Sequence, residues 1–214
     1  AASSSIVKYV AQRAGIGVNV GRIRSAGALI RQGDTTSTGL VPFIKLFQAA
    51  INSCNQGGVR KGSGTLYWPI WHLEAEELLV LKNNKGTEDN RARQVDYAVQ
   101  FNKVFYERLL KGENITLFCP SDVPGLYEAF FKDTEEFREI YEAAEKKKGI
   151  RKKVVKAIDL FSSFMQERKD TGRIYLMNVD HCNTHGSYHN STVYMSNLCL
   201  EIQIAGRPQK SFED

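Results

Sequence analysis

The chain has 214 residues, of which 42% are hydrophobic and 10% aromatic, and its formal net charge is +5. A chain of this composition can bury a core, which excludes a disordered protein and a small disulfide-stabilised scaffold. No apolar run approaches the roughly 18 residues needed to cross a bilayer, and the first residues lack the basic and apolar segments of a secretion signal. The four cysteines form no CxxC pair. We therefore expect a cytoplasmic protein with reduced thiols and no membrane partner.

The positive charge is concentrated near the amino terminus. Residues 1–63 carry eight basic side chains and one acid, whereas the rest of the chain has 21 basic and 23 acidic groups. Arginines beside glycines favour a multiply charged anion as the ligand over a general attraction to nucleic acid. A solvated basic surface is the alternative interpretation. We expect no nucleic-acid partner.

The first part of the chain predicts two helices, one strand and two loops. A serine-capped helix with apolar residues at helical spacing ends at Gly15. Residues 16–20 alternate like a short strand, and a basic loop follows over 21–34. A proline near the start opens an apolar helix over 41–51. Residues 52–64 form a glycine-rich loop.

The middle of the chain predicts two further strands, each followed by a helix. Residues 65–71 are typical of a strand, in which Pro69 indicates an edge position or a bulge. A helix is expected over 73–81. Alternating apolar residues predict a strand over 95–101, and the chain then becomes helical over 103–110.

The last part of the chain predicts one long helical region and three strands. A short strand over 115–118 precedes a stretch, 121–169, that is largely helical. The charge run at 145–153 within it indicates a solvated face or a connection between helices. Two strands, 173–179 and 193–204, finish the chain.

Helices and strands alternate along the whole sequence, so the predicted fold class is α/β. Neither an internal repeat nor a linker-like segment is visible, which predicts a single domain over residues 1–214. About six strands are too few to close a barrel of ~250 residues. We therefore expect either an open sheet or part of a larger architecture.

The segment SNLCLEI, residues 196–202, carries the most informative pattern. On a strand, alternate side chains share a face, so Asn197, Cys199 and Glu201 would form one row. Such a row offers an amide, a thiol and a carboxylate that can accept a proton, and a sugar ring could touch all three. An ordinary half-buried strand with an incidental cysteine is the alternative. The opposite face, expected to contact the core, would carry Leu198, Leu200 and Ile202.

SNLCLEI resembles the active-site finger loop of the large subunit of class I ribonucleotide reductases from bacteria and their phages. Other segments are similar to consecutive parts of the same subunit, in the same order: SSIVKYVAQRAGIG, GRIRSAGALIRQGD, NQGGVRKGS, WHLEAEELLVLKNN, ITLFCPSDVPGLYEAFF and QERKDTGRIYLMNVDHCNTH. The resemblance implies part of the ten-stranded α/β barrel of that subunit, with the finger loop at about 193–204.

The resemblance also implies a catalytic set. Cys199 would become a thiyl radical that abstracts the 3′ hydrogen of a ribonucleotide, and we expect apolar neighbours to keep it a neutral thiol before that step. Glu201 would act as the general base on the 3′ hydroxyl. Asn197 would bind the ribose hydroxyls, and Ala14 and Gly15 would offer a backbone contact to the substrate.

The two loops near the amino terminus are similar to the family's specificity-effector loops. In the first, residues 20–34, Arg24 and Arg31 would bind the phosphates of a deoxynucleoside triphosphate or ATP. In the second, residues 52–63, Gln56 and Arg60 would couple the effector base to the choice of substrate base. A plain flexible connector is the alternative for the second loop.

The resemblance implies several partners: a ribonucleoside diphosphate as substrate, a second large-subunit chain, and a small subunit that holds the radical cofactor. The chain itself would bind no cofactor directly. The family's ATP cone, reducing cysteine pair, substrate-phosphate loop, radical-transfer tyrosines and carboxyl-terminal thiols have no counterpart in this sequence. We therefore expect a fragment, or one part of a split subunit that joins a complementary carboxyl-terminal piece, and no turnover by this chain alone. A non-catalytic nucleotide-binding and assembly fragment is the alternative.

The histidines suggest no metal centre. His181, Cys182, His185 and His189 could be imagined as zinc ligands, but their spacing matches no zinc motif. We expect no metal site, and we expect His72 to be a satisfied interior or helix-capping residue.

Overall fold

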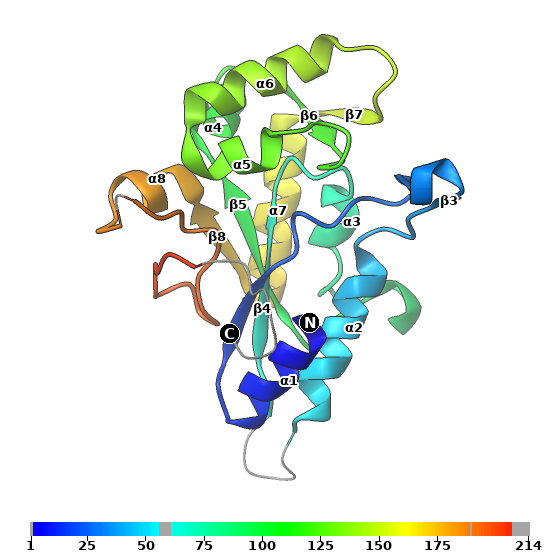
Figure 1. The fold of residues 1–214 in the computed structure, drawn as a ribbon, viewed down its shortest axis with the longest axis vertical. Helices are drawn as coiled ribbons and strands as arrows, with labels where there is room; N and C mark the ends of the chain where they lie inside the picture. Colours follow the sequence, from blue (N-terminus) through cyan, green and yellow to red (C-terminus); the bar gives the residue numbers. More distant parts are fainter. Residues whose placement is uncertain (1, 56–60, 189, 207–214) are drawn as a thin grey trace.

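A computed structural model describes residues 2–55, 61–188 and 190–206. Helices and strands alternate in the ribbon of Figure 1, as the sequence predicts. The elements up to residue 101 are α1 (Ala2–Ala11), β1 (Ile16–Asn19), β2 (Leu29–Ile30), η1 (Arg31–Gly33), β3 (Thr35–Thr36), α2 (Val41–Ser53), β4 (Gly64–Pro69), α3 (Ala75–Leu79), η2 (Glu88–Asn90) and β5 (Asp96–Phe101). The later elements are α4 (Lys103–Leu110), β6 (Asn114–Phe118), α5 (Leu126–Lys132), α6 (Thr134–Lys146), β7 (Lys152–Lys156), α7 (Ala157–Thr171), β8 (Ile174–Asn178) and α8 (Val179–Thr184).

A four-stranded parallel sheet in the order β1-β4-β5-β8 forms the centre of the molecule. Successive strands are connected through helices, which is the connection that parallel neighbours require. The central strands β4 and β5 are buried along their whole length. The α/β class is therefore confirmed.

The two faces of this sheet differ in chemistry. One face is apolar, and α2, α4 and α7 pack against it around Leu66, Trp68, Val99 and Phe101. The register places Asn19, Tyr67, Gln100 and other polar side chains together on the opposite face. Both faces are buried, so the polar face must also be covered.

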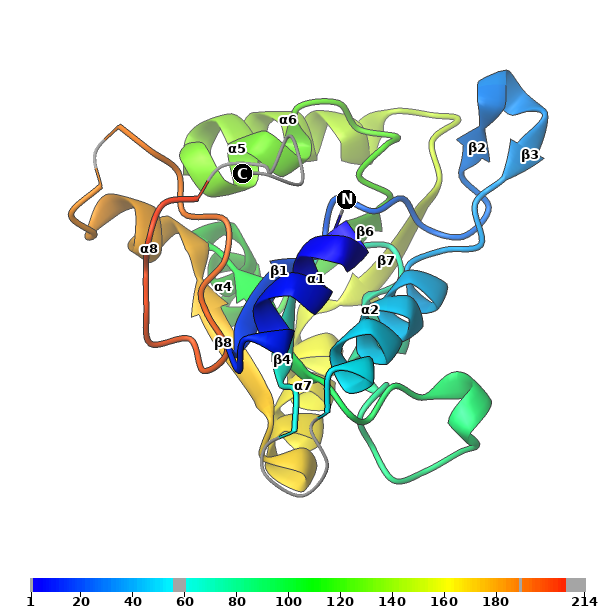
Figure 2. The ribbon, with the colours of Figure 1, turned by 60° about the horizontal axis from the view of Figure 1, so that its bottom comes forward.

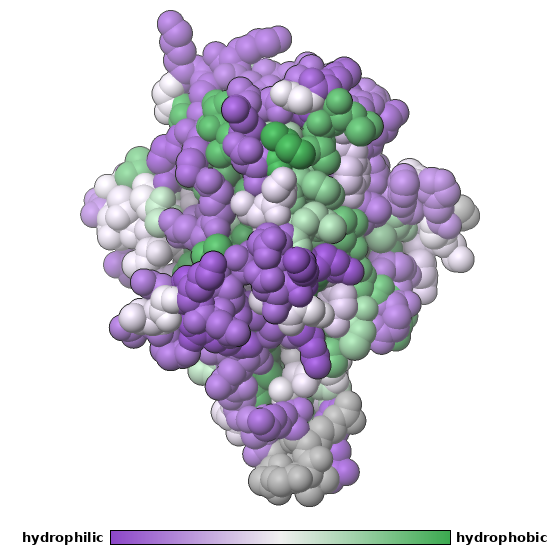
Figure 3. Space-filling model, turned by 180° about the vertical axis from the view of Figure 1, so that it is seen from behind, coloured by the Kyte–Doolittle hydropathy of each residue, from purple (hydrophilic) through white to green (hydrophobic). Residues whose placement is uncertain are grey.

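Two smaller units flank the sheet. The antiparallel pair β6-β7 lies with α5 and α6 at one end of the molecule, and the β2-β3 hairpin projects sideways from the molecule (Figures 1 and 2). The Asp133 carboxylate caps α6 by accepting the N–H groups of Glu135 and Glu136 at 2.8 and 3.0 Å. Seen from behind, the surface is mostly hydrophilic, with apolar residues exposed between the polar ones (Figure 3).

The charge run at 145–153 is partly misassigned by the sequence. We expected a helical region there, but residues Lys152–Lys156 form β7, which pairs with β6. Lys152 lies both in the charge run and in β7, and its ammonium group donates to the carbonyl oxygen of Lys147 at 2.9 Å. The charge run therefore begins in the last turn of α6, continues through the connection and ends in the first two residues of β7.

The expectation for Pro69 is also wrong. The strand that contains it, β4, is central and has no bulge in its register. Pro69 is tolerated because it is the last residue of β4, and β1 has already stopped pairing with β4 opposite Tyr67. The helix predicted over 73–81 is shorter than expected and covers Ala75–Leu79.

The strand predicted over 193–204 is absent from the described part of that segment, which is irregular throughout. Leu200 has a φ of 66°, which no strand residue adopts. Ile202, which we expected to contact the core, is 44% exposed. The alternation of apolar and polar residues in this segment therefore does not correspond to a β-strand.

Among the described residues, every helix is too short or too polar to cross a bilayer.

The prediction for His72 is confirmed. The ring is fully buried, with Nδ1 accepting from the Glu74 N–H at 3.2 Å and Nε2 lying 2.9 Å from the Ile23 carbonyl oxygen. Burial lowers the pKa of His72 from 6.5 to about 4, against the opposing effect of the Ile23 carbonyl. The ring is therefore neutral, with Nε2 as its donor.

This histidine predicts a loss of stability in acid. Because the unfolded chain binds more protons than the folded chain between pH 6.5 and pH 4, the contribution of neutral His72 is complete above pH 6.5 and is lost as the pH falls. We expect the free energy of unfolding in urea to fall by about 3 kcal/mol from this group over that range. His72→Gln, which keeps a donor and an acceptor, should show a smaller fall, whereas the exposed control His185→Gln should match the parent. Equal slopes for all three proteins would contradict the assignment.

Candidate functional site

The irregular segment 193–204, which is the predicted finger loop, covers the polar face of the parallel sheet (Figure 1). Its backbone carbonyl oxygens accept hydrogen bonds from side chains of three strands. The carbonyl groups of the finger loop are therefore satisfied by side-chain donors of the sheet, and not by backbone pairing with a neighbouring strand. The donors are Asn19 of β1, Thr65 and Tyr67 of β4, and Gln100 of β5.

The centre of the finger loop is fixed by two residues of β4. The Tyr67 hydroxyl donates to the carbonyl oxygen of Asn197 at 2.6 Å, and the Thr65 hydroxyl donates to the carbonyl of Leu198. Burial raises the pKa of Tyr67 well above its ordinary range. Tyr67 therefore stays protonated and remains a donor at any physiological pH.

The beginning of the finger loop is held by a pair of amides. The side chains of Asn19 and Gln100 each donate to the carbonyl oxygen of Tyr194 at 2.7 Å. They also contact each other, with Asn19 Nδ2 lying 3.3 Å from Gln100 Oε1. Two strands thus fix one carbonyl group, which sets the direction in which the loop continues.

The loop also closes on itself. The Ser196 hydroxyl accepts from the N–H of Ile202 at 3.2 Å, and the Asn197 side chain donates to Glu201 Oε1 at 2.6 Å. The left-handed conformation of Leu200 turns the chain between them. Asn197 and Glu201 therefore lie side by side, although not as neighbours on a strand.

Cys199 lies at the exposed tip of this turn. Its side chain faces Tyr175 of β8, whose pKa is raised chiefly by burial and then by the neighbouring Cys199. The expectation of an apolar surrounding for the thiol is wrong for the described chain, since Cys199 is exposed and Leu198 and Leu200 are only half-buried. The sulfur is accessible to a ligand.

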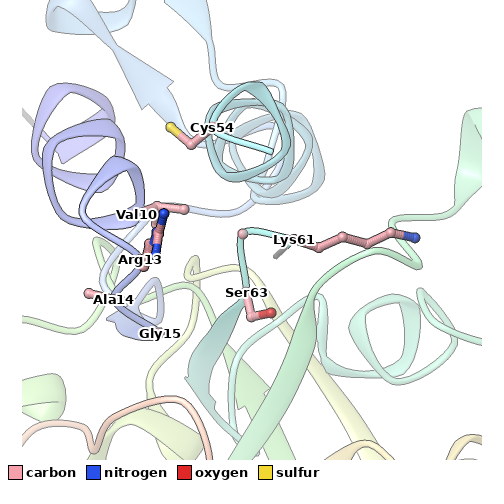
Figure 4. Close-up of a pocket in the computed structure, with 8 residues that line it drawn as sticks. Val10, Arg13, Ala14, Gly15, Cys54, Lys61 and Ser63 are labelled. Atoms are coloured by element: carbon pink, nitrogen blue, oxygen red, sulfur yellow. The ribbon is translucent and has the colours of Figure 1, made fainter. Parts of the chain in front are cut away.

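The turn at Ala14 and Gly15 lies directly under the finger loop. A β-carbon at Gly15 would come within 2.6 Å of Leu198 Cδ2, so glycine permits the Leu198 side chain to pack closely here. On its other side this turn lines a small pocket with the end of α2 and with Lys61 and Ser63 (Figure 4). The turn therefore connects the finger loop with the second loop.

The first basic loop folds as the β2-β3 hairpin. Arg24 and Arg31 are both exposed, and Arg24 donates to the Leu29 carbonyl oxygen at 3.0 Å. Arg31 begins the turn at the tip with a φ of 49°. Arg22 is instead occupied within the chain, because it pairs with Glu128 at 2.8 Å and lies over the Tyr127 ring.

The predicted site residues thus fall into two groups. Asn197, Cys199 and Glu201 gather with the turn at residues 14–15, whereas the hairpin lies on another side of the molecule (Figure 2). In the second loop, Asn55 Oδ1 accepts the Gly62 N–H at 2.6 Å. The two residues predicted to act there, Gln56 and Arg60, lie outside the described residues.

Among the described residues, no three histidine, cysteine or acidic side chains are arranged to hold a metal ion. His181 and His185 contact each other with ring centroids 5.1 Å apart. His189 lies outside the described residues.

Sequence reasoning missed the side chains that carry the finger loop. Thr65 and Tyr67 alternate with Leu66 and Trp68 in β4, and Gln100 stands between Val99 and Phe101 in β5. A buried parallel strand with polar residues on one face indicates that the face meets other polar groups. That alternation was the available signal.

Removing one donor tests this anchoring. Tyr67→Phe leaves the Asn197 carbonyl without its partner and should loosen the finger loop, since an unmade buried hydrogen bond costs about 1–3 kcal/mol. We expect chymotrypsin to cleave after Leu198 and Leu200 about tenfold faster than in the parent. Tyr188→Phe, which alters an exposed ring, is the control. An unchanged rate for Tyr67→Phe would show that the hydroxyl does not hold the loop.

Comparison with known proteins gives the family. The model of the ribonucleotide reductase barrel domain matches residues 1–211. The ribonucleoside-diphosphate reductase subunit alpha of Haemophilus influenzae is 59% identical over all of this chain and 29% of its own length. Subunit alpha of reductase 1 from Escherichia coli is 61% identical over 97% of this chain and 28% of its length. The enterobacteria phage T4 subunit alpha is 52% identical over 95% and 27%.

The chain spans less than a third of the length of these relatives. The match nevertheless extends over nearly all of its own residues and includes both the hairpin and the finger loop. The chain belongs to the ribonucleotide reductase barrel-domain family.

Proposed function

We propose that this chain, as a single partial barrel domain over residues 1–214, is the radical-bearing and effector-binding part of a ribonucleoside-diphosphate reductase large subunit. The observation that carries the proposal is the turn of the finger loop. It presents an accessible thiol at Cys199 while a 2.6 Å hydrogen bond holds Asn197 against Glu201. A ribose ring placed on this turn would meet a hydrogen-atom acceptor, a hydroxyl ligand and a base together.

The proposed reaction begins when the radical of the small subunit takes the hydrogen atom of the Cys199 thiol and converts Cys199 into a thiyl radical. The sulfur then takes the hydrogen atom from C3′ of the ribonucleotide, forming an S–H bond and leaving the unpaired electron on C3′. Glu201 accepts the proton of the 3′ hydroxyl, and the 2′ hydroxyl departs as water after taking a proton from one thiol of an external dithiol. Two further reducing equivalents must come from a dithiol outside this chain.

The remaining site residues have supporting roles in this proposal. Asn197 binds the ribose hydroxyls, and its contact with Glu201 sets the distance between ligand and base. The backbone at Ala14 and Gly15 contacts the substrate next to the finger loop. Gln56 and Arg60 select the substrate base, which the position of the second loop beside the turn at residues 14–15 favours.

The test of the catalytic role uses the chain mixed with the complementary segments of the large subunit and a radical-generating small subunit. Cys199→Ser should abolish deoxynucleotide formation, because the serine O–H bond is too strong for the exchange. Glu201→Gln should lower turnover about 10²–10⁴-fold. Cys182→Ser is the control, because this thiol lies in α8, outside the finger loop. Persistent product with Cys199→Ser would contradict the radical assignment.

The hairpin is proposed to bind the phosphates of a deoxynucleoside triphosphate or ATP. Arg24 and Arg31 are exposed guanidinium groups at the base and tip of the β2-β3 hairpin, and neither forms an ion pair among the described residues. Planar forks of this kind bind phosphate oxygens in pairs.

Replacing both arginines by alanine should weaken dTTP binding at least about tenfold in equilibrium dialysis, because charge-assisted hydrogen bonds are lost. Arg22→Ala, which removes a side chain paired with Glu128, is the control. Binding that depends on these arginines, with no reaction in any reconstitution, would favour the alternative of a non-catalytic nucleotide-binding fragment. Unchanged dTTP binding would exclude the effector site in both versions.

A second large-subunit chain is proposed to dock on α1 and α2, which lie side by side (Figure 1). Val7, Tyr9, Phe43 and Leu46 on these helices are 39–49% exposed. Exposed apolar residues gathered on neighbouring helices are typical of an interface.

Leu46→Asp should therefore shift sedimentation equilibrium from dimer toward monomer, because a carboxylate would lose its water on association. Leu110→Asp, at another highly exposed apolar position, is the control. A parent chain that is monomeric at all accessible concentrations would contradict this interface.

A further inference from the structure

Four side chains from outside the hairpin hold the base of the first loop. We call this base the loop root and define it as the backbone of Ile23, Ser25, Ala26 and Leu40. The contacting residues come from the turn after β4, the end of β6 and the segment before β7. They are His72, Glu74, Cys119 and Arg151.

Glu74 joins the two ends of the loop. Its carboxylate accepts the Leu40 N–H at 3.0 Å, just before α2, and the backbone of Ala26, on the entering side of the loop, lies close enough to lower the pKa of Glu74. Glu74 is only 8% exposed, and a β-carbon at Gly39 would collide with its carboxylate. One buried carboxylate therefore lies between the segment that enters the hairpin and the segment that leaves it.

Arg151 holds the same point from the other side. Its Nη1 donates to the Ala26 carbonyl oxygen at 2.7 Å, and its Nε donates to Asp122 Oδ2 at 3.0 Å. The guanidinium also forms an ion pair with Asp122, with Nη2 2.9 Å from Oδ2. Arg151 therefore fixes the Ala26 carbonyl group, beside the Glu74 carboxylate. The positive charge of Arg151 also offsets part of the cost of burying the Glu74 carboxylate.

The remaining two contacts complete the loop root. His72 binds the Ile23 carbonyl at 2.9 Å, and the Ser25 N–H donates to Cys119 Sγ at 3.3 Å. Above the root, the hairpin depends on its own ladder, in which Gly27 N–H donates to the Ser37 carbonyl at 2.9 Å. The geometry of the tip is therefore set where the root is held.

We propose that Glu74 and Arg151 are positioning residues for effector binding, which hold the hairpin in its binding conformation although neither is placed to contact the nucleotide. This inference rests on the proposed effector role of Arg24 and Arg31. Because the loop is ordered before the ligand arrives, binding loses less conformational entropy and is tighter. If the root opens, the apparent dissociation constant rises in proportion to the loss of the competent fraction.

The test uses two variants of the root and one matched control. Glu74→Gln keeps the size of the side chain but removes the charge of the group that accepts the Leu40 N–H and faces Arg151. Arg151→Gln removes the guanidinium fork. Glu76→Gln makes the same chemical change on α3 at a side chain that is 46% exposed.

Two readouts are measured on the full chain. The first is the rate of tryptic cleavage after Arg31 without nucleotide, which should rise about tenfold in both root variants and stay unchanged in Glu76→Gln. The second is dTTP binding, which should weaken about tenfold in the root variants. Circular dichroism of each variant establishes that the sheet and helices are retained.

The outcomes separate this inference from the proposed function. Unchanged cleavage after Arg31 overturns the inference, whatever the binding. Faster cleavage with unchanged dTTP affinity also overturns it, because the root would then hold the loop without serving the ligand. If the Arg24 and Arg31 alanine variant binds dTTP as the parent does, the proposed effector site fails, and the inference fails with it as a statement about effectors. Faster cleavage with weaker binding in both root variants supports it.

Discussion

The polar face of the parallel sheet is the constraint on which the candidate site depends. Buried donors without partners cost about 1–3 kcal/mol each, so the side chains of Asn19, Tyr67 and Gln100 must find acceptors. The finger loop supplies them as backbone carbonyls at Tyr194 and Asn197. The sheet and the loop therefore satisfy each other, and the loop is held in place without belonging to the sheet.

Side chains from elsewhere in the fold also hold the loop root, where they bind both N–H and carbonyl groups of the backbone. There the buried Glu74 and His72 and the half-buried Arg151 bind the two ends of a hairpin whose tip is exposed. The chain thus fixes two irregular segments by their bases and leaves their functional ends free. A turn at residues 14–15 and the pocket beside it lie between the finger loop and the second loop.

The sequence predicted the elements that depend on periodicity, and it failed where side chains replace a backbone ladder. The helix at 103–110 and the strand at 115–118 follow from local patterns, and the structure contains both. The alternation in 196–202 predicted a strand, but hydrogen bonds from Thr65 and Tyr67 decide that conformation, and these partners are about 130 residues away. The family resemblance, not the periodicity, identified this segment as a loop. The positions of Gln56 and Arg60 stay a prediction.

The most direct test of this account is a nuclear Overhauser measurement on the chain in solution. The packing of Leu198 against Gly15 predicts a strong effect between the Leu198 methyl protons and the Gly15 α-protons. This contact exists only if the finger loop lies on the sheet beside β1. A spectrum that shows the contacts between β1 and β4 but no contact between Leu198 and Gly15 would contradict the proposed arrangement of the site.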